Sequence, residues 1–371
     1  MRQKNIMNME KSARAVKKLV EYKQKLDVEL ERYFALKMTE AEKVSPQAVR
    51  TIEVLKRFTL SAGKRIRPAL AYYGYLAAEG KDETEMLKTS MAIELVHIFL
   101  LVHDDIIDRD EKRHGIETVH ETYRKWGKEL GLWGSEARHF GNSMAIVVGD
   151  AAYLLANEVL YRSKFEAEII VATLDRMQEV AYHTTQGQLM DVLVGAQRSA
   201  TEEEIMKIQE NKTARYTFEG PLHLGVILAG KKEDQELMDI LSAYALPVGR
   251  AFQMRDDILV IFGNEKKLGK AVGADIIEGK QTLLIVKAWE WGTREQKKQI
   301  KRLLGKKNLS LPELEMFRKI VKDTGSLEYS QKLAEQLVAE ALEVLQRARF
   351  KNEEARKFLE GIAEYIIKRE V

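Results

Sequence analysis

Apolar residues recur along most of the chain at intervals of three and four, the spacing that one buried face of an α-helix produces. Convincing runs of alternating apolar and polar residues, as in half-buried strands, are not found. The pattern therefore predicts an all-α fold. Long helices are expected at residues 9–38, 84–107, 143–163, 166–195, 202–230, 234–262, 313–323, 327–348 and 352–368.

Three stretches interrupt the helical pattern and predict loops. Residues 127–141 are rich in glycine and are expected to form a loop insertion between helices, residues 263–280 combine glycine with lysine, and residues 305–312 are a short polar break. No shift in composition marks a domain boundary. We therefore expect one domain over residues 1–371, with residues 1–24 as a helical N-terminal extension.

Composition narrows the choice of function. The 60 Lys and Arg residues nearly balance 57 Asp and Glu residues, and a net charge of +3 is not the footprint of a nucleic-acid-binding protein. The absence of cysteine excludes disulfides and thiolate metal sites. We see neither a signal peptide nor an apolar run that approaches the roughly 18 residues of a membrane-spanning helix. The expectation is a cytoplasmic protein without a transmembrane segment.

The segment Asp104-Asp105-Ile106-Ile107-Asp108 follows a wholly apolar stretch. Asp104 and Asp108 are four residues apart, so a helix places both carboxylates on one face, and Asp105 adds a third charge. This charge at the end of a buried helix is costly unless a cation compensates it. Magnesium takes such oxygen ligands together with substrate phosphates. By itself, the segment could equally be an exposed acidic helix end.

A second acidic cluster, Asp256-Asp257, ends another apolar helix, and Gln253 lies one turn before it. Two acidic helix ends in one helical chain suggest facing walls of one metal site. Gln188 and Asp191 form a third polar pair, which alone would be an ordinary surface pair.

Basic residues supply the charge that a diphosphate needs. The segment 63–68 carries Lys64, Arg65 and Arg67 beside a glycine, and arginine can grip phosphate oxygens with two N–H groups. His97 lies seven residues before Asp104, on the same helix face. Taken one at a time, these would be a basic turn and a core histidine. Further basic candidates are Arg113, Lys212, Lys270 and Lys280.

These motifs, in this order, resemble those of the trans-isoprenyl diphosphate synthases, also called polyprenyl synthetases. The resemblance runs from about residue 25 to the C-terminus. It implies an isoprenoid synthase bundle of long helices around a deep central cavity, in a homodimer. The motifs are GKRIRP (63–68), ELVH (94–97), HDDIID (103–108), GQLMD (187–191), KTA (212–214), FQMRDDI (252–258) and GKAVGADIIEGKQT (269–282).

The resemblance implies a role for each motif residue. Roughly three magnesium ions are expected, of the oxygen-ligated kind, at Asp104, Asp108 and Asp256, with Asp105 and Asp257 beside them. The allylic diphosphate is expected at Arg113, Lys212, Lys270, Gln253 and Lys280. Isopentenyl diphosphate is expected at Lys64, Arg67, His97 and His114. The reacting centre is expected at Lys212, Thr213, Gln188 and Asp191.

Product length should depend on the residues before Asp104. Phe99 lies five residues upstream, about 7.5 Å away along a helix. In similar enzymes a bulky residue here closes the elongation pocket, and Leu100 is smaller than the aromatic residue typical of strict farnesyl producers. We therefore expect a C20 product, geranylgeranyl diphosphate, with C15 or C25 next. The alternative is that Phe99 only packs in the core.

Two positions depart from the family pattern. His114 stands where a second arginine is usual, and because histidine is only partly charged near neutral pH, weaker binding of isopentenyl diphosphate is expected. Val260 stands where the second acidic motif usually has a third carboxylate, so the third metal should be held less firmly. A non-catalytic regulatory subunit of a heteromeric synthase is therefore an alternative. A terpene cyclase would lack the isopentenyl site.

Overall fold

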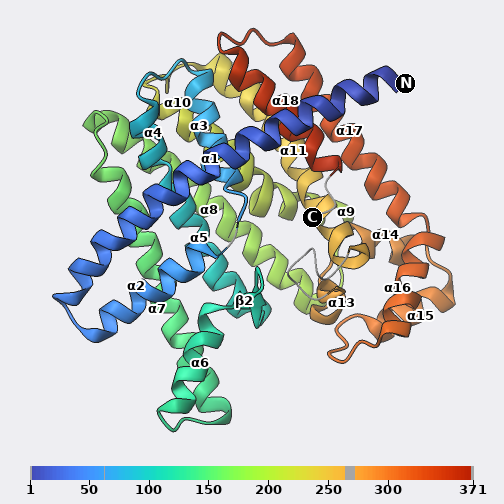
Figure 1. Cartoon of the computed structure of the whole chain (residues 1–371). Coiled ribbons are helices and arrows are strands. Elements are labelled where there is room, and N and C mark those ends of the chain that lie inside the picture. The colour runs from blue at the N-terminus through green and yellow to red at the C-terminus, as the bar shows by residue number, and fades with distance from the viewer. Residues whose placement is uncertain (1, 62, 264–271, 369–371) are drawn as a thin grey trace. The chain divides into compact units, whose positions relative to one another are not determined.

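The computed structural model describes residues 2–61, 63–263 and 272–368, with the backbone alone at residues 2–9. Helices dominate the described chain, which confirms the all-α prediction (Figure 1). Residue contacts group it into two compact units: a smaller unit of residues 18–72 and 81–174, and a larger unit of residues 1–17, 73–80 and 175–371. The single domain predicted from the sequence stays a prediction.

The smaller unit contains the first acidic motif. Helix α5 packs along α7, and α7 also packs along α6. Helices α1, α3 and α8 are shared with the larger unit. The elements are α1 (Arg2–Glu42), α2 (Pro46–Leu60), α3 (Ile66–Ala77), α4 (Glu83–Thr89), α5 (Met91–Asp108), β1 (Lys112–Arg113), β2 (Ile116–Glu117), α6 (Val119–Glu129), α7 (Gly134–Tyr161) and α8 (Ala167–Gln197).

The larger unit packs around α11, which contacts η1, α17 and α18. The hydroxyl of Tyr244 on α11 donates to the carbonyl of Leu359 on α18 at 2.8 Å. The elements are α9 (Glu202–Ile208), the π-helix η1 (Gln209–Glu219), α10 (Gly220–Leu228), α11 (Gln235–Phe262), α13 (Ala274–Glu278), α14 (Leu283–Trp291), α15 (Arg294–Leu303), α16 (Leu311–Asp323), α17 (Ser326–Arg347) and α18 (Glu353–Lys368).

The loop predicted at residues 127–141 is wrong. Helix α6 continues to Glu129 and α7 starts at Gly134, so only a short connection separates them. Gly127 and Gly141 lie where the two helices pack closely, whereas Gly131 and Gly134, with φ angles of 88° and 57°, lie in the connection between the helices and at its end. A Cβ on Gly141 would lie 2.5 Å from the carbonyl oxygen of His120 and 2.9 Å from the nitrogen of Arg124.

Two other predicted helices are interrupted. The helix expected at 84–107 is two helices, because Ser90 ends α4 and its hydroxyl bonds the carbonyl of Leu87. The helix expected at 202–230 contains η1, whose hydrogen bonds run over five residues. The loop predicted at 263–280 includes the short helix α13, and its residues 264–271 lie outside the described residues.

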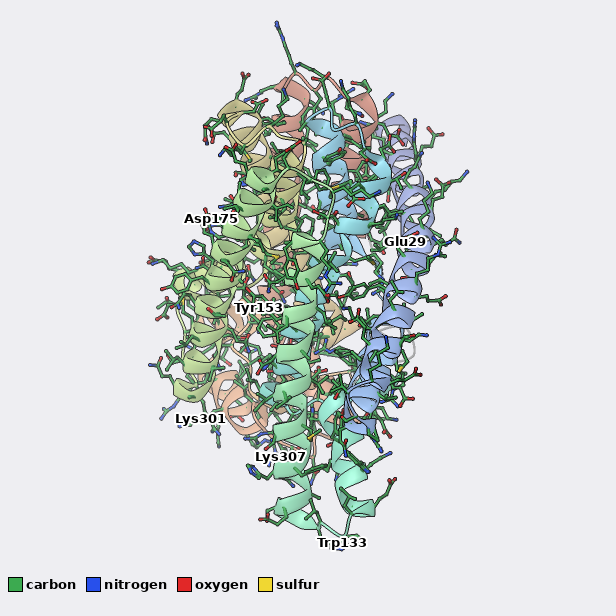
Figure 2. All side chains as sticks on the ribbon, turned by 90° about the vertical axis from the view of Figure 1, so that its left-hand side faces the viewer. Glu29, Trp133, Tyr153, Asp175, Lys301 and Lys307 are labelled. Atoms are coloured by element: carbon green, nitrogen blue, oxygen red, sulfur yellow. The ribbon has the colours of Figure 1, made fainter. Side chains whose placement is uncertain are left out.

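Helix α7 is long and apolar enough to cross a membrane by length and composition. The same test is passed by core helices of proteins without membrane spans, and α7 is packed on one side by α5 and α6. Figure 2 shows it running from the end marked by Trp133 past Tyr153. The absence of a transmembrane segment stays a prediction.

The packing at Gly141 predicts opposite effects for two matched substitutions. Gly141→Ala should destabilise the fold by about 1–3 kcal/mol, because the new methyl group meets backbone atoms of α6. Gly195→Ala in α8 meets nothing within 4 Å and should stabilise by about 0.5–1 kcal/mol through helix propensity. Urea unfolding of both variants measures the difference. A Gly141→Ala variant as stable as Gly195→Ala would contradict the packing argument.

Candidate active site

A short hairpin after α5 returns an arginine to the first acidic motif. Helix α5 ends at Asp108, and the next residue is left-handed with φ 60°. Strands β1 and β2 pair antiparallel around His114 and Gly115, whose φ angles are 53° and 80°. Positive φ at both central residues is typical of a two-residue type I′ turn. Histidine is among the residues that tolerate this conformation.

Arg113 on β1 pairs with Asp105. Its Nε donates to Asp105 Oδ1 at 2.6 Å, and its Nη2 lies 3.2 Å from Asp110 Oδ2 and 3.7 Å from Asp104 Oδ2. Burial opposes the charged guanidinium, but Asp105 and then Asp104 and Asp110 outweigh it and raise the pKa of Arg113. The Asp105 side chain is 0% exposed. Its carboxylate therefore serves the fold through Arg113, whereas Asp104 and Asp108 are only half-buried.

Asp104 and Asp108 fit magnesium by the chemistry of their donors, since both offer hard carboxylate oxygens on one turn of α5. In the part of the chain that the structure describes, no cluster of three or more histidine and acidic side chains forms a metal site. Magnesium, however, is usually held by one or two carboxylates plus substrate phosphates and water. Two carboxylates at a helix end therefore suit an ion that binds together with a diphosphate.

Basic groups lie on the same unit. Arg67 Nη1 is 3.1 Å from His97 Nε2. Loss of solvent, followed by the charge of Arg67, lowers the pKa of His97 well below its ordinary value. An arginine can only donate hydrogen bonds, so a neutral His97 accepts at Nε2 and keeps its proton on Nδ1. Lys64 is exposed, Arg67 is half-buried, and His114 is exposed in the hairpin turn.

Arg65, the middle cation of the GKRIRP motif, points into the fold. Its Nη1 donates to Glu94 Oε1 at 2.6 Å and its Nε to Asp27 Oδ1 at 2.9 Å. Its side chain is 0% exposed. The partner Glu94 belongs to the ELVH motif, so these two motifs hold each other. Sequence reasoning missed this pair, although a glutamate inside an apolar helix was a signal for it.

The larger unit brings a second set of predicted residues together. Lys212 Nζ donates to Asp191 Oδ2 at 2.6 Å, and Thr213 Oγ1 donates to Gln253 Oε1 at 2.8 Å. The Nε2 atom of Gln188 is buried without a hydrogen-bond partner among the described residues. A buried donor of this kind is costly unless a ligand satisfies it. The residues of the predicted reacting centre thus lie on α8 and η1, and Thr213 also contacts Gln253 on α11, which was predicted for the allylic diphosphate.

Asp257 is buried, and its Oδ1 accepts from Gln253 Nε2 at 2.8 Å. Burial and then the nearby Asp275 raise the pKa of Asp257 well above its usual range. Asp256 is half-buried on the same helix. Lys280 lies 3.0 Å from Glu278.

Lys270, predicted for the allylic diphosphate, lies outside the described residues. The first acidic motif belongs to the smaller unit and the second to the larger unit. That the two motifs face each other across one site stays a prediction.

Phe99 lies against two aromatic rings. Its centroid is 5.0 Å from that of Tyr153 on α7 and 4.9 Å from that of His103 on α5. His103 in turn packs against Gly149, where a Cβ would clash with the imidazole ring. Leu100 is half-buried. The position predicted to limit product length is therefore braced by α7.

Comparison with known proteins agrees with these motifs. Residues 50–321 match the family described as polyprenyl synthetase. The geranylgeranyl diphosphate synthase of Methanosarcina mazei is 34% identical over 312 residues, which cover 84% of this chain and 87% of that protein. The geranylfarnesyl diphosphate synthase of Natronomonas pharaonis is 29% identical over 348 residues, which cover 89% and 93%.

The same family appears among solved structures. The geranylgeranyl pyrophosphate synthase of Corynebacterium glutamicum, in complex with isoprenyl diphosphate and magnesium, superposes with a TM-score of 0.88 at 30% identity. The superposition covers 94% of this chain and 98% of that one. The family match spans well over half of the sequence, and the alignment with the M. mazei protein covers most of both chains. The chain belongs to the polyprenyl synthetase family, the family of prenyltransferases that its motifs indicated.

Proposed function

We propose that this chain condenses isopentenyl diphosphate with an allylic diphosphate and releases a short-chain all-trans prenyl diphosphate, the C20 geranylgeranyl diphosphate. One observation carries the proposal. Within the smaller unit, α5 presents His97, held by Arg67, on the face that leads two turns later to Asp104. Sites for a diphosphate and for a metal thus lie along one helix.

Isopentenyl diphosphate is expected at Lys64, Arg67 and His97. Arg67 supplies a guanidinium that can donate to phosphate oxygens, and a neutral His97 adds an Nδ1–H donor without repelling Arg67. His114 is exposed in the turn beside Arg113, where a second arginine is usual. A shorter side chain that is partly neutral near pH 7 should bind the diphosphate more weakly.

Asp104 and Asp108 would hold magnesium with the allylic diphosphate, and Asp256 would hold a further ion less firmly because Val260 replaces a carboxylate. Magnesium, when bound, would stabilise the charge that develops on the departing diphosphate. Lys212 would add a cationic contact to the same leaving group. Its ion pair with Asp191 orients the ammonium group before substrate arrives.

The reaction begins when the carbon–oxygen bond of the allylic substrate breaks and its electron pair leaves with diphosphate. The double bond of isopentenyl diphosphate then forms the new carbon–carbon bond to the allylic carbon. A proton is lost to the released diphosphate. Thr213 and Gln188 line the reacting centre in this scheme, and the unsatisfied amide of Gln188 is available as a donor there. Side-chain nucleophiles are not required.

The C20 assignment rests on Phe99 and on the relatives. Phe99 lies five residues before Asp104 and is held by Tyr153. A relative of similar length is a geranylgeranyl diphosphate synthase, and another is a C25 synthase, so C25 and C15 are the next candidates. The relatives named above are synthases, which supports catalysis over a regulatory subunit.

We also propose a homodimer, formed through α7. Val147, Leu154 and Tyr161 recur every seven residues and are 60%, 68% and 57% exposed. Seven residues are almost two helical turns, so these side chains form one apolar stripe. Ile146 beside them is 45% exposed. Closed dimers are the commonest way in which such a surface is covered. A cytoplasmic location remains the expectation from the sequence.

The central experiment incubates the purified full chain with labelled isopentenyl diphosphate, magnesium and each of the C5, C10 and C15 allylic primers. Label should enter longer prenyl diphosphates, and the longest major product should be C20. No incorporation with any primer would remove the catalytic proposal and favour the regulatory alternative.

The three neighbouring aspartates should separate into two classes. Asp104→Asn and Asp108→Asn should lower activity on the order of a hundredfold or more, because they remove ligands for the leaving-group metal. Their thermal midpoints should stay near that of the parent. Asp105→Asn should instead destabilise the fold by about 3–5 kcal/mol, since Arg113 loses its buried partner. Equal loss of stability in all three variants would contradict this division.

Phe99→Ala should lengthen the main product by at least one C5 unit, because the space now filled by the ring would become available to the growing chain. Phe140→Ala is the matched control, since that ring packs against Trp126 on α6. Product chain lengths can be compared by chromatography after removal of the diphosphate. An unchanged product from Phe99→Ala would assign the ring to core packing alone.

Leu154→Lys and Val147→Lys should convert the dimer to a monomer, because each places a charge in the apolar stripe. Val171→Lys on α8 is the control, since Val171 is 65% exposed but lies outside the stripe. Light scattering coupled to size exclusion gives the molar mass. A parent protein that is already monomeric would contradict the proposed homodimer.

A further inference from the structure

The π-helix η1 carries Lys212 and Thr213, and its register decides where they point. It lies between α8 and α11 at very close range. A Cβ on Gly187 would clash with the backbone of Lys212, and one on Gly249 would clash with Ala214. π-Helices are rare and are frequently found at functional sites. Some interaction must therefore favour the wide helix over an ordinary α-helix.

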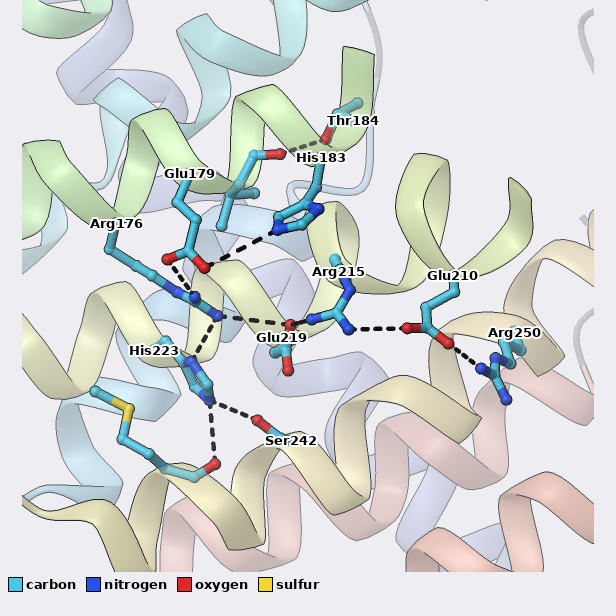
Figure 3. Close-up of polar contacts among 12 residues, drawn as sticks. Arg176, Glu179, His183, Thr184, Glu210, Arg215, Glu219, His223, Ser242 and Arg250 are labelled. Atoms are coloured by element: carbon cyan, nitrogen blue, oxygen red, sulfur yellow. Dashed lines mark hydrogen bonds and ion pairs between the residues drawn. The ribbon is translucent and has the colours of Figure 1, made fainter. Parts of the chain in front are cut away.

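A series of charges runs along the other side of η1 (Figure 3). Arg215 Nη2 donates to Glu210 Oε1 at 2.8 Å, and Arg215 Nη1 donates to Glu219 Oε2 at 3.0 Å. Glu210 and Arg215 are five residues apart, and Arg215 and Glu219 are four apart. Both spacings are close to one turn of a helix whose hydrogen bonds run over five residues. In an α-helix, a spacing of five would place two side chains about 140° apart. The Glu210–Arg215 pair thus matches the π-register specifically.

Both ends of this series are tied to neighbouring helices. Glu210 Oε2 also accepts from Arg250 on α11. Glu219 Oε2 lies 3.5 Å from Arg176 Nη2 on α8, and Arg176 Nη1 donates to Glu179 at 2.6 Å. Figure 3 shows the continuous line from Arg250 through Arg215 to Arg176.

The same two helices supply the partners of the catalytic candidates. Lys212 bonds Asp191 on α8, and Thr213 bonds Gln253 on α11. The charge series and these two contacts therefore hold η1 to the same neighbours from different sides. A change from π- to α-register would rotate Lys212 and Thr213 relative to their partners.

We propose that Arg215 is a positioning residue: by bridging Glu210 and Glu219, it holds residues 209–219 in the π-register that aims Lys212 and Thr213 at the reacting substrates. The inference rests on the function proposed above. Arg215 does not itself contact substrate. It acts through the direction of Lys212 and Thr213.

Arg215→Met should lower kcat about 10- to 100-fold, because small displacements of a positioning group have effects of this size. The KM for isopentenyl diphosphate should change little, since its predicted contacts Lys64, Arg67 and His97 belong to the smaller unit. Steady-state kinetics with excess allylic primer separates the two constants. Arg215→Lys, which keeps one ion pair, should recover part of kcat.

Arg356→Met is a matched control. Arg356 grips Glu353 at 2.7 Å and Glu360 at 2.9 Å in the α-helix α18, and its side chain is 28% exposed, against 29% for Arg215. Both substitutions remove an arginine from between two glutamates. Similar shifts in thermal midpoint are expected, but only Arg215→Met should reduce kcat. Equal kcat values in the two variants would overturn the proposal.

A double-mutant cycle tests whether Arg215 acts through Lys212. In a Lys212→Met background, Arg215→Met should lower the remaining activity by no more than about twofold, because coupled residues are not additive. Full additivity overturns the proposal. Should Arg215→Met fail to fold, Glu210→Gln, which keeps the side-chain shape, should show the same reduced kcat and the same loss of additivity. An inactive parent would count against the proposed function, whereas an active parent with an unaffected Arg215→Met would count against this inference alone.

Discussion

The ion pair between Arg113 and Asp105 compensates the buried charge at the C-terminal end of α5. A carboxylate that is fully buried must be compensated, because an unpaired charge in the interior costs several kcal/mol. Arg113, on strand β1 of the hairpin, provides the compensating positive charge, and the same ion pair holds the hairpin against α5. Asp105 accepts a 2.6 Å hydrogen bond from Arg113, while Asp104 and Asp108 are half-buried at the helix end. The three aspartates of the first acidic motif thus differ, since Asp105 is buried in an ion pair while Asp104 and Asp108 are half-buried.

The same division recurs in other motifs. Arg65 forms ion pairs with Glu94 and Asp27 inside the fold. Lys64 and Arg67 on either side are more accessible to solvent. Both the first acidic motif and the GKRIRP motif contain a charged residue that is buried in an ion pair and charged residues that are more exposed. The buried partners of Asp105 and Arg65 lie in other segments of the chain, so neither motif by itself reveals the pairing.

Glycine positions determine how closely the helices approach. Gly141 lets α7 lie on α6, and Gly187 and Gly249 let α8 and α11 close on η1. At each position a methyl group would meet a neighbouring backbone or its attached atoms. The approach at η1 also brings Asp191 and Gln253 within hydrogen-bonding range of Lys212 and Thr213. The close packing that the glycines permit therefore also places the polar side chains within reach of one another.

Periodicity predicted the all-α class and several of the long helices, because a buried helical face leaves a repeating pattern in the chain, but it did not show the interruptions within 84–107 and 202–230. The loop prediction from glycine content failed at residues 127–141, because Gly127 and Gly141 lie inside helices α6 and α7. A glycine that permits close packing and one that permits a turn are identical in sequence. The motifs likewise predicted the family and the candidate site residues, and the family is confirmed. The roles of the individual site residues remain predictions.

The amino-acid sequence by itself determined the helical class, the two acidic motifs and the family, since these depend on local spacing and on residue type. Only the tertiary structure decided that Asp105 and Arg65 are internal ion-pair partners and that residues 209–219 adopt a π-helix. The physical reason is that burial, pairing and helix register depend on groups far apart in the chain. Glu210, for example, accepts a hydrogen bond from Arg250, which lies forty positions later in the chain, and no pattern within either segment predicts this contact.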